Sequence, residues 1–204
     1  MEVDVVANPR YLRLSPDDYL ELERNATVRS EYEAGVAYLM AGASRPHTLI
    51  VGNFNGELRE CFRSRPCESY TNDMKVWITA ANSFYYPDIV AVCGERIFRD
   101  EREDVLLNPM VVVEVLSHST ERDDKGRKLR NYQLLPSLQS YVLIAQDEPF
   151  IQHYFRQADG RWGYESLQGV EEKLTLDAIG VVMNLSEIYL KVDFEEDNDF
   201  LAPD

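Results

Sequence analysis

The 204-residue sequence predicts an α/β or α+β fold in which helices flank a mixed β-sheet. Three observations lead to this prediction. Residues 109–116 read PMVVVEVL, a nearly continuous apolar run that is typical of a strand covered on both faces. Residues 47–62 carry apolar side chains at helical spacing, which indicates a helix with one face on a sheet. Short β-rich segments then alternate with helical patterns along the chain.

The first 62 residues are predicted to form two helices and a hairpin. The segment SPDD at 15–18 combines a capping serine, a proline at the first helical position and acids in the first turn, so a short helix begins there. Candidate strands at 28–34 and 36–40 lie on either side of Gly35, which suits a hairpin turn. The helix at 47–62 follows.

The rest of the chain is predicted to consist mostly of strands. Segments rich in β-branched and aromatic residues are bounded by Asn, Gly or Pro. They predict strands at 68–71, 74–79, 87–93, 109–116, 139–145, 151–155 and 162–166. A polar helix from Thr120 or Asp123 to about Leu135 lies between the fourth and fifth of these, and Pro136 ends it. A helical turn is expected at 185–190.

Length and composition predict one domain. Hydrophobic residues make up 45% and charged residues 28% of the chain, as in ordinary globular proteins. No repeat or linker is visible, so we expect an extension at 1–10, a domain at 11–191 and an acidic, flexible tail at 192–204. No apolar run approaches the roughly 20 residues of a membrane span. The N-terminus lacks the apolar region of a signal peptide.

The three cysteines are Cys61, Cys67 and Cys93. Their number is odd and their spacing does not match a metal site, so we expect reduced thiols and a cytoplasmic protein.

The net charge of −15 argues against a general nucleic-acid coat, which would be basic. Six acids lie in the tail, and removing them still leaves a net charge of −9. Any contact with a polyanion must therefore be local or mediated by metal. Phe194, Phe200 and Leu201 are consistent with a short interaction segment in the tail, although a frayed terminus is the favoured interpretation.

Two carboxylates interrupt otherwise apolar strands. Asp88 precedes IVAV, and Glu114 lies inside VVVEVL. A buried carboxylate needs a cation, hydrogen bonds or a proton, so a structural salt bridge stays open as an explanation. If the two strands are neighbours, the carboxylates face each other, and a divalent cation would relieve their repulsion. Such a cation polarises phosphoryl oxygens and activates water, which is the chemistry of phosphodiester hydrolysis.

A basic partner for these acids is expected on the following helix. Residues 122–130 contain five basic side chains, which also fit a solvated helix face. Lys128 shares a face with Lys125 and Tyr132, and it is predicted to reach back to the end of the Glu114 strand. Lys125 is the weaker candidate.

Several stretches resemble the Uma-two family of restriction-endonuclease-like proteins, in the PD-(D/E)XK nuclease superfamily. They are YPDIVAV, NPMVVVEVLSHST and DDKGRKLRNYQLLPSLQSYVLI, and RSEYEAGVAYLM and SRPHTLIVGNF extend the resemblance over about residues 11–191. The block E-V-L-S-x-S-T followed by D-x-x-x-K-x-x-x-Y is fairly specific. The resemblance implies a restriction-endonuclease-like mixed sheet flanked by helices, DNA as substrate, and Mg²⁺ or Mn²⁺ as cofactor.

The resemblance also implies catalytic residues. Asp88 and Glu114 match the metal-binding acids of the two motifs, and Glu31 matches a further ligand or metal-orienting group. From the residues alone, Glu31 reads as an exposed charge. Leu116 stands where the motif places its lysine, and Lys128 matches the lysine that this family carries on the next helix.

Further residues are candidates for substrate contact. His47 matches a family position near a helix N-terminus, where capping or packing explains it equally well. Lys125 is a second candidate, and Tyr132 is a third for which packing is the preferred explanation. The family reads S-P-S-T where this chain has SHST, and we interpret His118 as a surface substitution rather than a phosphate contact.

The favoured hypothesis is a metal-dependent endodeoxyribonuclease. The main alternative is a catalytically silent protein that keeps the fold and acts as a binding or regulatory partner. A glycosidase that uses Asp88 and Glu114 is weaker, because no aromatic cluster for sugar stacking lies near them in the sequence. A twofold homodimer is the expected assembly.

Overall fold

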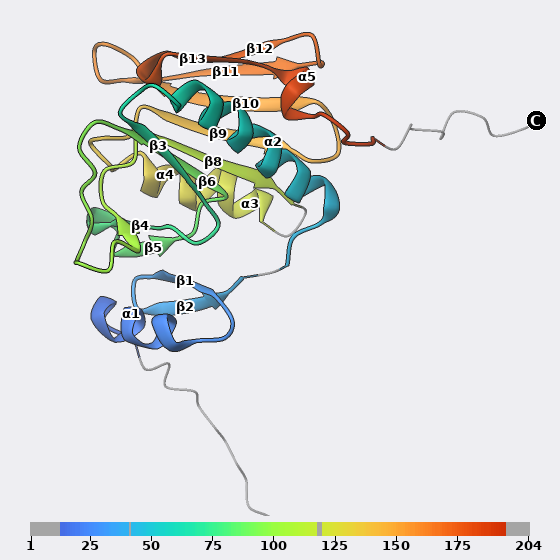
Figure 1. Cartoon of the computed structure of the whole chain (residues 1–204). Helices are drawn as coiled ribbons and strands as arrows, with labels where there is room; N and C mark the ends of the chain where they lie inside the picture. The colour runs from blue at the N-terminus through green and yellow to red at the C-terminus, as the bar shows by residue number, and fades with distance from the viewer. Residues whose placement is uncertain (1–12, 41, 118–119, 195–204) are drawn as a thin grey trace, which may run out of the picture.

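A six-stranded mixed sheet forms the centre of the fold (Figure 1), in a computed structural model that describes residues 13–40, 42–117 and 120–194. Its strand order is β11-β10-β9-β8-β6-β3. Strands β8 and β9 are parallel, and the other neighbours are antiparallel. The strands are β3 (Cys67–Thr71), β6 (Ile89–Cys93), β8 (Val111–Leu116), β9 (Ser140–Ala145), β10 (Phe150–Arg156) and β11 (Trp162–Gln168). The predicted mixed sheet is confirmed.

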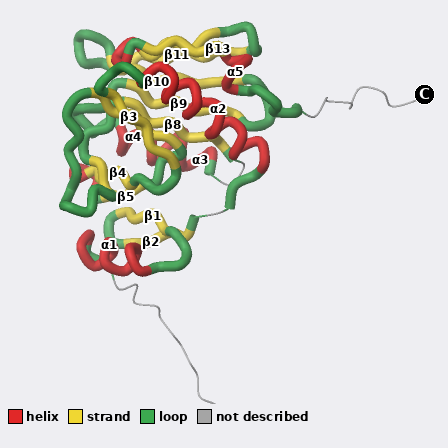
Figure 2. The backbone as a smooth tube through the Cα atoms, viewed as in Figure 1, coloured by secondary structure: helices red, strands yellow, loops and turns green. Residues whose placement is uncertain are grey.

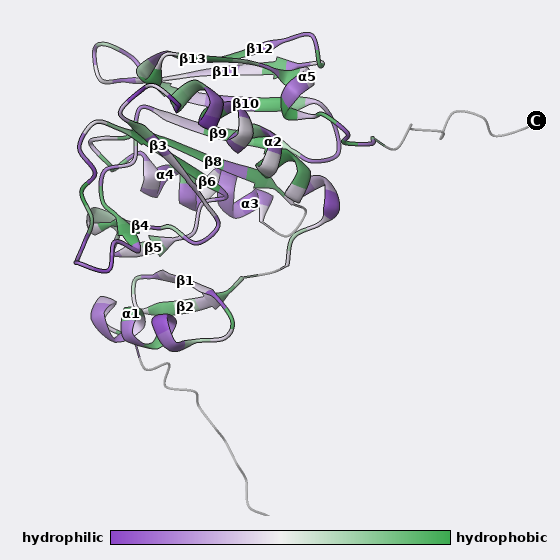
Figure 3. Ribbon diagram, viewed as in Figure 1, coloured by the Kyte–Doolittle hydropathy of each residue, from purple (hydrophilic) through white to green (hydrophobic). Residues whose placement is uncertain are grey.

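Strand β8 is buried along its whole length, as its apolar run predicts. Alternate residues point to opposite faces of a strand. Val111, Val113 and Val115 therefore pack in one core with helix α2 (Arg45–Phe62), whereas Val112 packs in a second core on the other face. Figure 3 shows hydrophobic residues along β6 and β8 in the interior.

Helix α2 confirms the helix predicted at 47–62 and begins two residues earlier. The Ser44 hydroxyl accepts a hydrogen bond from the His47 amide, which caps the first turn. Ile50, Phe54 and Leu58 are fully buried along one stripe against the sheet. Burial of each such side chain stabilises the fold by about 1.5–3 kcal/mol.

The opposite face of the sheet carries the segment that follows β8 (Figure 2). It consists of α3 (Glu121–Asp123), one π-helical turn (Asp124–Lys128) and α4 (Leu129–Tyr132). The sequence predicted one continuous α-helix here, whereas the structure has a π-helical turn between two short α-helical segments.

A second sheet lies beside the first and has the order β2-β1-β5-β4-β7. Its strands are β1 (Ser30–Glu33), β2 (Val36–Leu39), β4 (Lys75–Ile78), β5 (Ser83–Tyr85) and β7 (Val105–Leu106), and a 3₁₀ turn (Thr79–Ala81) precedes β5. Helix α1 (Pro16–Asn25) contributes Tyr19 to a small aromatic core with Tyr32 and Phe84. The predicted hairpin is confirmed, and Gly35 adopts φ +101° at its turn.

An ion cluster ties α1 to the second sheet. Asp104 accepts hydrogen bonds from Arg24 at 2.6 and 3.0 Å, and the Lys75 ammonium lies 3.0 Å from the same carboxylate. Partial burial alone would raise the pKa of Asp104, but these basic groups outweigh it and lower the pKa to about 2.

Two short strands near the C-terminus were not predicted. β12 (Lys173–Leu176) and β13 (Val181–Asn184) form a separate hairpin around a 3₁₀ turn (Asp177–Ile179), followed by α5 (Leu185–Ile188). Apolar residues of this hairpin and of α5 extend the core around α2, including Leu174, Val181 and Leu185. The helical turn predicted at 185–190 is confirmed.

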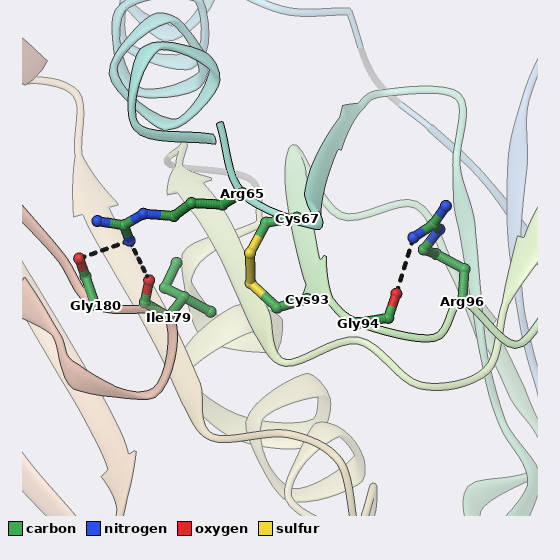
Figure 4. The surroundings of a disulfide bond; sticks show 7 residues. All are labelled: Arg65, Cys67, Cys93, Gly94, Arg96, Ile179 and Gly180. Carbon is green, nitrogen blue, oxygen red and sulfur yellow. Dashed lines mark hydrogen bonds between the residues drawn. A yellow bond between two sulfur atoms is a disulfide. The ribbon is translucent and has the colours of Figure 1, made fainter. Parts of the chain in front are cut away.

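Cys67 and Cys93 form a disulfide bond, so the expectation of reduced thiols is wrong for this pair (Figure 4). The two residues lie opposite each other on β3 and β6, with Cα atoms 4.0 Å apart. The two cysteines are 26 residues apart, so the sequence alone did not indicate that they are neighbours in space. Cys61 is the free cysteine among the described residues. The cytoplasmic location stays a prediction.

The predicted extension at 1–10 and most of the acidic tail lie outside the described residues, as does His118. Within the tail, the Phe194 ring packs edge-on against Tyr189, with ring centroids 5.5 Å apart. Over the described ranges, no helix combines the length and the apolar character needed to cross a membrane. The boundaries of the domain stay predictions.

Candidate active site

Asp88 directly precedes β6 and Glu114 lies on the neighbouring strand β8, which agrees with the predicted adjacency of the two segments. Ile89 pairs with Val113 in the antiparallel register, and one further step sets Asp88 opposite Glu114. Glu114 lies between the apolar residues that face α2, so its side chain points to the other face, where the π-helical turn lies. This carboxylate is only 4% exposed.

The Lys128 ammonium lies among three carboxylates. Its Nζ atom is 2.9 Å from Glu31 Oε1, 3.3 Å from Asp124 Oδ1 and 3.5 Å from Glu114 Oε1. The Lys128 residue is 8% exposed, and its ammonium also lies over the Tyr85 ring, 5.3 Å from the centroid. The lysine therefore reaches the end of the Glu114 strand, where the sequence placed it.

The π-helical turn positions Lys128 and Asp124 toward the sheet. The Tyr141 hydroxyl donates a hydrogen bond to the Asp124 carbonyl oxygen at 3.0 Å, which ties the turn to strand β9. Gly126 lies within the turn. Single π-helical turns inside helices are frequent at functional sites, because they redirect side chains.

Glu31 reaches the same ammonium from the second sheet. It lies on β1, and its Oε1 atom also accepts a hydrogen bond from the Tyr86 amide at 3.1 Å. The interpretation of Glu31 as an exposed charge, made from the residues alone, is wrong. The position implied by the resemblance brings it together with Glu114 and Lys128.

Asp88 has different partners from the other acids. Its Oδ2 atom accepts a hydrogen bond from the Val115 amide at 2.7 Å and lies 3.1 Å from Nε2 of His47. His47 comes from the first turn of α2, so this helix reaches the site at its N-terminal end. The structure thus places His47 beside a predicted metal ligand.

Negative charge exceeds positive charge in this buried cluster. Burial raises the pKa of Glu114 well above its usual value, and it also raises the pKa values of Glu31 and Asp124, because the one ammonium only partly offsets the desolvation. Burial alone would lower the pKa of Lys128, but Glu114 and the two other acids raise it well above its usual value. The surrounding carboxylates therefore favour the charged form of the lysine.

The oxygen atoms of the site are of the kind that bind a hard divalent cation. Mg²⁺ and Mn²⁺ prefer carboxylate oxygens, and four carboxylates lie here with one lysine. Asp124 Oδ1 is buried and has no hydrogen-bond donor, although the Lys128 ammonium is near it. Among the described residues, no three acidic, histidine or cysteine side chains already surround one point, because Lys128 lies between the acids.

Sequence reasoning missed several residues of the site. Asp124 begins the quoted motif D-x-x-x-K-x-x-x-Y, four residues before Lys128, so its spacing was a usable signal. Glu33 is buried and forms an ion pair with Arg127 at 2.6 Å, and it also accepts a hydrogen bond from the Tyr85 hydroxyl. That pair joins β1 to the π-helical turn, and no local pattern indicated it.

Two of the residues predicted to contact substrate do not expose a free polar group to the site. Lys125 Nζ lies 2.6 Å from Glu121 and borders a separate hollow near Gln146. Tyr132 is fully buried, and its hydroxyl donates to Glu114 Oε1 at 3.2 Å. Tyr132 therefore packs against Glu114 and orients its carboxylate.

A pocket of about 640 Å³ opens over these residues. Its described lining carries six carboxylates and three basic groups together with His47. The charged residues are Arg29, Glu31, Glu33, Asp88, Glu114, Asp123, Asp124, Arg127 and Lys128. Space for a small substrate group therefore lies directly beside the acids.

The chain is similar to several known proteins. Residues 16–186 match the family Uma2, described as "Putative restriction endonuclease". Two proteins of Synechocystis are similar, and both are named as uncharacterized: sll1609, 34% identical over 81% of this chain and 92% of its own length, and slr1290, 32% identical over 87% and 92%. A crystal structure from Anabaena variabilis, titled a putative nuclease belonging to DUF820, has a similar fold. Its TM-score is 0.71 at 17% identity, covering 86% of this chain and 97% of that one.

Proposed function

Because the chain belongs to the Uma2 family of restriction-endonuclease-like proteins, we propose that it is a metal-dependent endonuclease that hydrolyses DNA phosphodiester bonds. The observation that carries the proposal is the cluster of Glu31, Glu114 and Lys128, which are brought together from three separate elements. Family membership favours this reaction over the glycosidase alternative.

Glu31, Asp88 and Glu114 would hold Mg²⁺ or Mn²⁺, and Asp124 Oδ1, which lies 3.3 Å from Lys128 Nζ, is beside them. The bound cation would supply a Lewis acid that polarises a phosphoryl oxygen and lowers the pKa of water. Carboxylates that repel one another in a buried site gain from such a cation, because it replaces the water they have lost.

Lys128 would stabilise negative charge rather than remove a proton. The surrounding acids raise its pKa well above the usual value, which favours the protonated form and the role of a hydrogen-bond donor. An ammonium held in a buried site can donate hydrogen bonds to the phosphate oxygens as charge develops on them. Its carboxylate partners hold it in position for this task.

His47 would orient Asp88 and line the path of the phosphate. Its Nε2 atom lies 3.1 Å from Asp88, and the residue borders the pocket. A helix N-terminus favours negative groups, so a phosphate is electrostatically suited to this end of α2.

The test combines DNA cleavage with metal-induced stabilisation. The purified chain is incubated with supercoiled plasmid in Mg²⁺, Mn²⁺ or no metal, over a range of salt concentrations. We expect metal-dependent nicking. We also expect Mn²⁺ at a hundredfold excess over Kd to stabilise the fold by ~2.7 kcal/mol, which corresponds to a rise in Tm of about 5–11 °C.

Glu114→Gln should abolish both the nicking and most of the metal-induced rise in Tm. Glu165→Gln is the matched control. Glu165 is on the edge strand β11, where it pairs with His153 of β10, and it lies outside the pocket. DNA that stays intact with every metal, while the protein is folded, would favour the catalytically silent alternative. Retained metal stabilisation in Glu114→Gln would contradict the assignment of this ligand.

A further inference from the structure

We propose that the pocket takes unpaired DNA and that Tyr38 stacks on a base next to the phosphate held at the acids. This inference rests on the proposed function for the position of that phosphate. The reactive carboxylates lie deep in the protein. Glu114 is 4% exposed and Asp124 is 2% exposed, so they lie at the floor of the pocket.

A phosphate of an intact duplex is poorly suited to such a floor. Double-stranded DNA is stiff over about 50 nm and bending it costs energy, whereas a single strand bends freely. Enzymes that react with a base at a recessed site act on single strands, or they extrude the nucleotide from the duplex, and we extend this reasoning to a recessed phosphate site. The depth of the acids therefore favours a strand that can bend into the pocket.

The charges around the pocket also disfavour a duplex. Duplex binding depends on many Lys and Arg contacts to phosphates. Each basic residue that lines the described part of this pocket already has an acidic partner: Arg29 has Asp73, Arg127 has Glu33, and Lys128 has the acids of the site. Affinity for DNA must then come from another kind of contact.

Tyr38 supplies that contact at the mouth of the pocket. It lies directly opposite Glu31 in the β1–β2 register, so both side chains are on the same face of the hairpin. Its side chain is 44% exposed, and the neighbouring Leu39 is also exposed. A base attached to a phosphate at Glu31 would therefore lie within reach of an open aromatic ring.

Arg127 holds the Tyr38 ring in place. The guanidinium carbon lies 5.4 Å from the ring centroid, and Arg127 belongs to the π-helical turn that also carries Lys128. One turn thus positions both the ammonium at the floor and the aromatic group at the mouth. Stacking of bases on aromatic side chains is the usual source of affinity for single strands, and it tolerates any sequence.

The test measures binding separately from cleavage. Every variant keeps Glu114 so that the metal site stays intact, and fluorescence anisotropy with Ca²⁺, which also takes carboxylate oxygens as ligands, follows a labelled 12-nucleotide single strand and the matching 12-base-pair duplex. A gel run after each titration shows that the labelled strand is still whole. We expect the single strand to bind at least about tenfold more tightly. Tyr38→Ala should weaken its binding by about 5- to 150-fold, which is the range for loss of one stacked base. Tyr38→Phe should stay within about twofold, because the ring is retained.

Tyr164→Ala is the matched control, since Tyr164 is 51% exposed on β11 and does not line the pocket. It should bind the single strand as tightly as the parent does. Equal or tighter binding of the duplex, unchanged binding by Tyr38→Ala, or binding of neither probe would overturn the inference. Binding of the single strand that depends on Tyr38, without cleavage by the unmutated protein, would refute only the nuclease proposal.

Discussion

Replacement of Lys128 by Met tests the central contact of the site. The change keeps most of the side-chain volume and removes the ammonium that lies 2.9, 3.3 and 3.5 Å from three carboxylates. Loss of one partner from a buried ion pair costs about 3–5 kcal/mol, because the remaining charges are left without compensation. In a domain of this size, the expected fall in Tm is about 6–20 °C.

The pH dependence of this loss has a definite sign. Burial already raises the pKa of Glu114, and Lys128 opposes that rise, so the pKa increases further in Lys128→Met. The folded variant then binds more protons than the unfolded chain above pH 4.5, the usual pKa of the glutamate, and its stability falls as the pH rises. We therefore expect the loss in the free energy of unfolding to be larger at pH 8 than at pH 5.

Urea unfolding at pH 5 and pH 8, without metal, measures both values. Lys125→Met is the control, because its ion pair with Glu121 is partly exposed and should contribute no more than about 0.5 kcal/mol. Added Mn²⁺ should stabilise Lys128→Met more than the parent, since the cation then meets carboxylates without a competing ammonium. A variant as stable as the parent at pH 8 would refute the reasoning that Lys128 neutralises buried acids.

Three further predictions concern other parts of the structure. The pKa of Asp104 is lowered to about 2 despite partial burial, so its stabilising effect is full above pH 3.8 and is lost as the pH falls toward 2. Asp104→Asn should cost about 1–2 kcal/mol at pH 7, less than the full shift implies because the side chain is 27% exposed. A difference from the parent that does not change between pH 7 and 2.5 in urea unfolding would contradict this. The double variant Cys67→Ser with Cys93→Ser should lower the free energy of unfolding by about 3.5 kcal/mol, because the disulfide closes a 26-residue separation. A reducing agent should then lower the stability of the parent but not that of the double variant. Equal sensitivity of both proteins would be inconsistent with the bond. Tyr132→Phe should lower kcat and leave the KM for DNA unchanged, since this buried hydroxyl contacts a site carboxylate; a rise in KM alone would indicate substrate contact instead.

Local patterns in the sequence were sufficient for the main elements. The apolar run at 109–116 predicted a strand buried on both faces, because such burial leaves no polar alternation. The periodicity at 47–62 predicted α2 for a similarly local reason. The two acids that interrupt apolar strands were visible in the same way, since a charge in such a run is unusual and demands a partner.

Other features depend on residues that are distant in the chain. The disulfide was missed because β3 and β6 meet only through their register. The hairpin of β12 and β13 was missed because strands of four residues give a weak alternating pattern. The π-helical turn was missed because its cause lies in contacts with the sheet, such as the hydrogen bond from Tyr141.

By itself, the sequence determined the main elements, the acidic character of the chain and the family to which it belongs. Only the tertiary structure decided that Lys128 lies between Glu31, Asp124 and Glu114, and that Asp88 pairs with His47 instead. The physical reason is that hydropathy and spacing act over a few neighbouring residues. The balance of buried charge depends on which strands and turns meet in space.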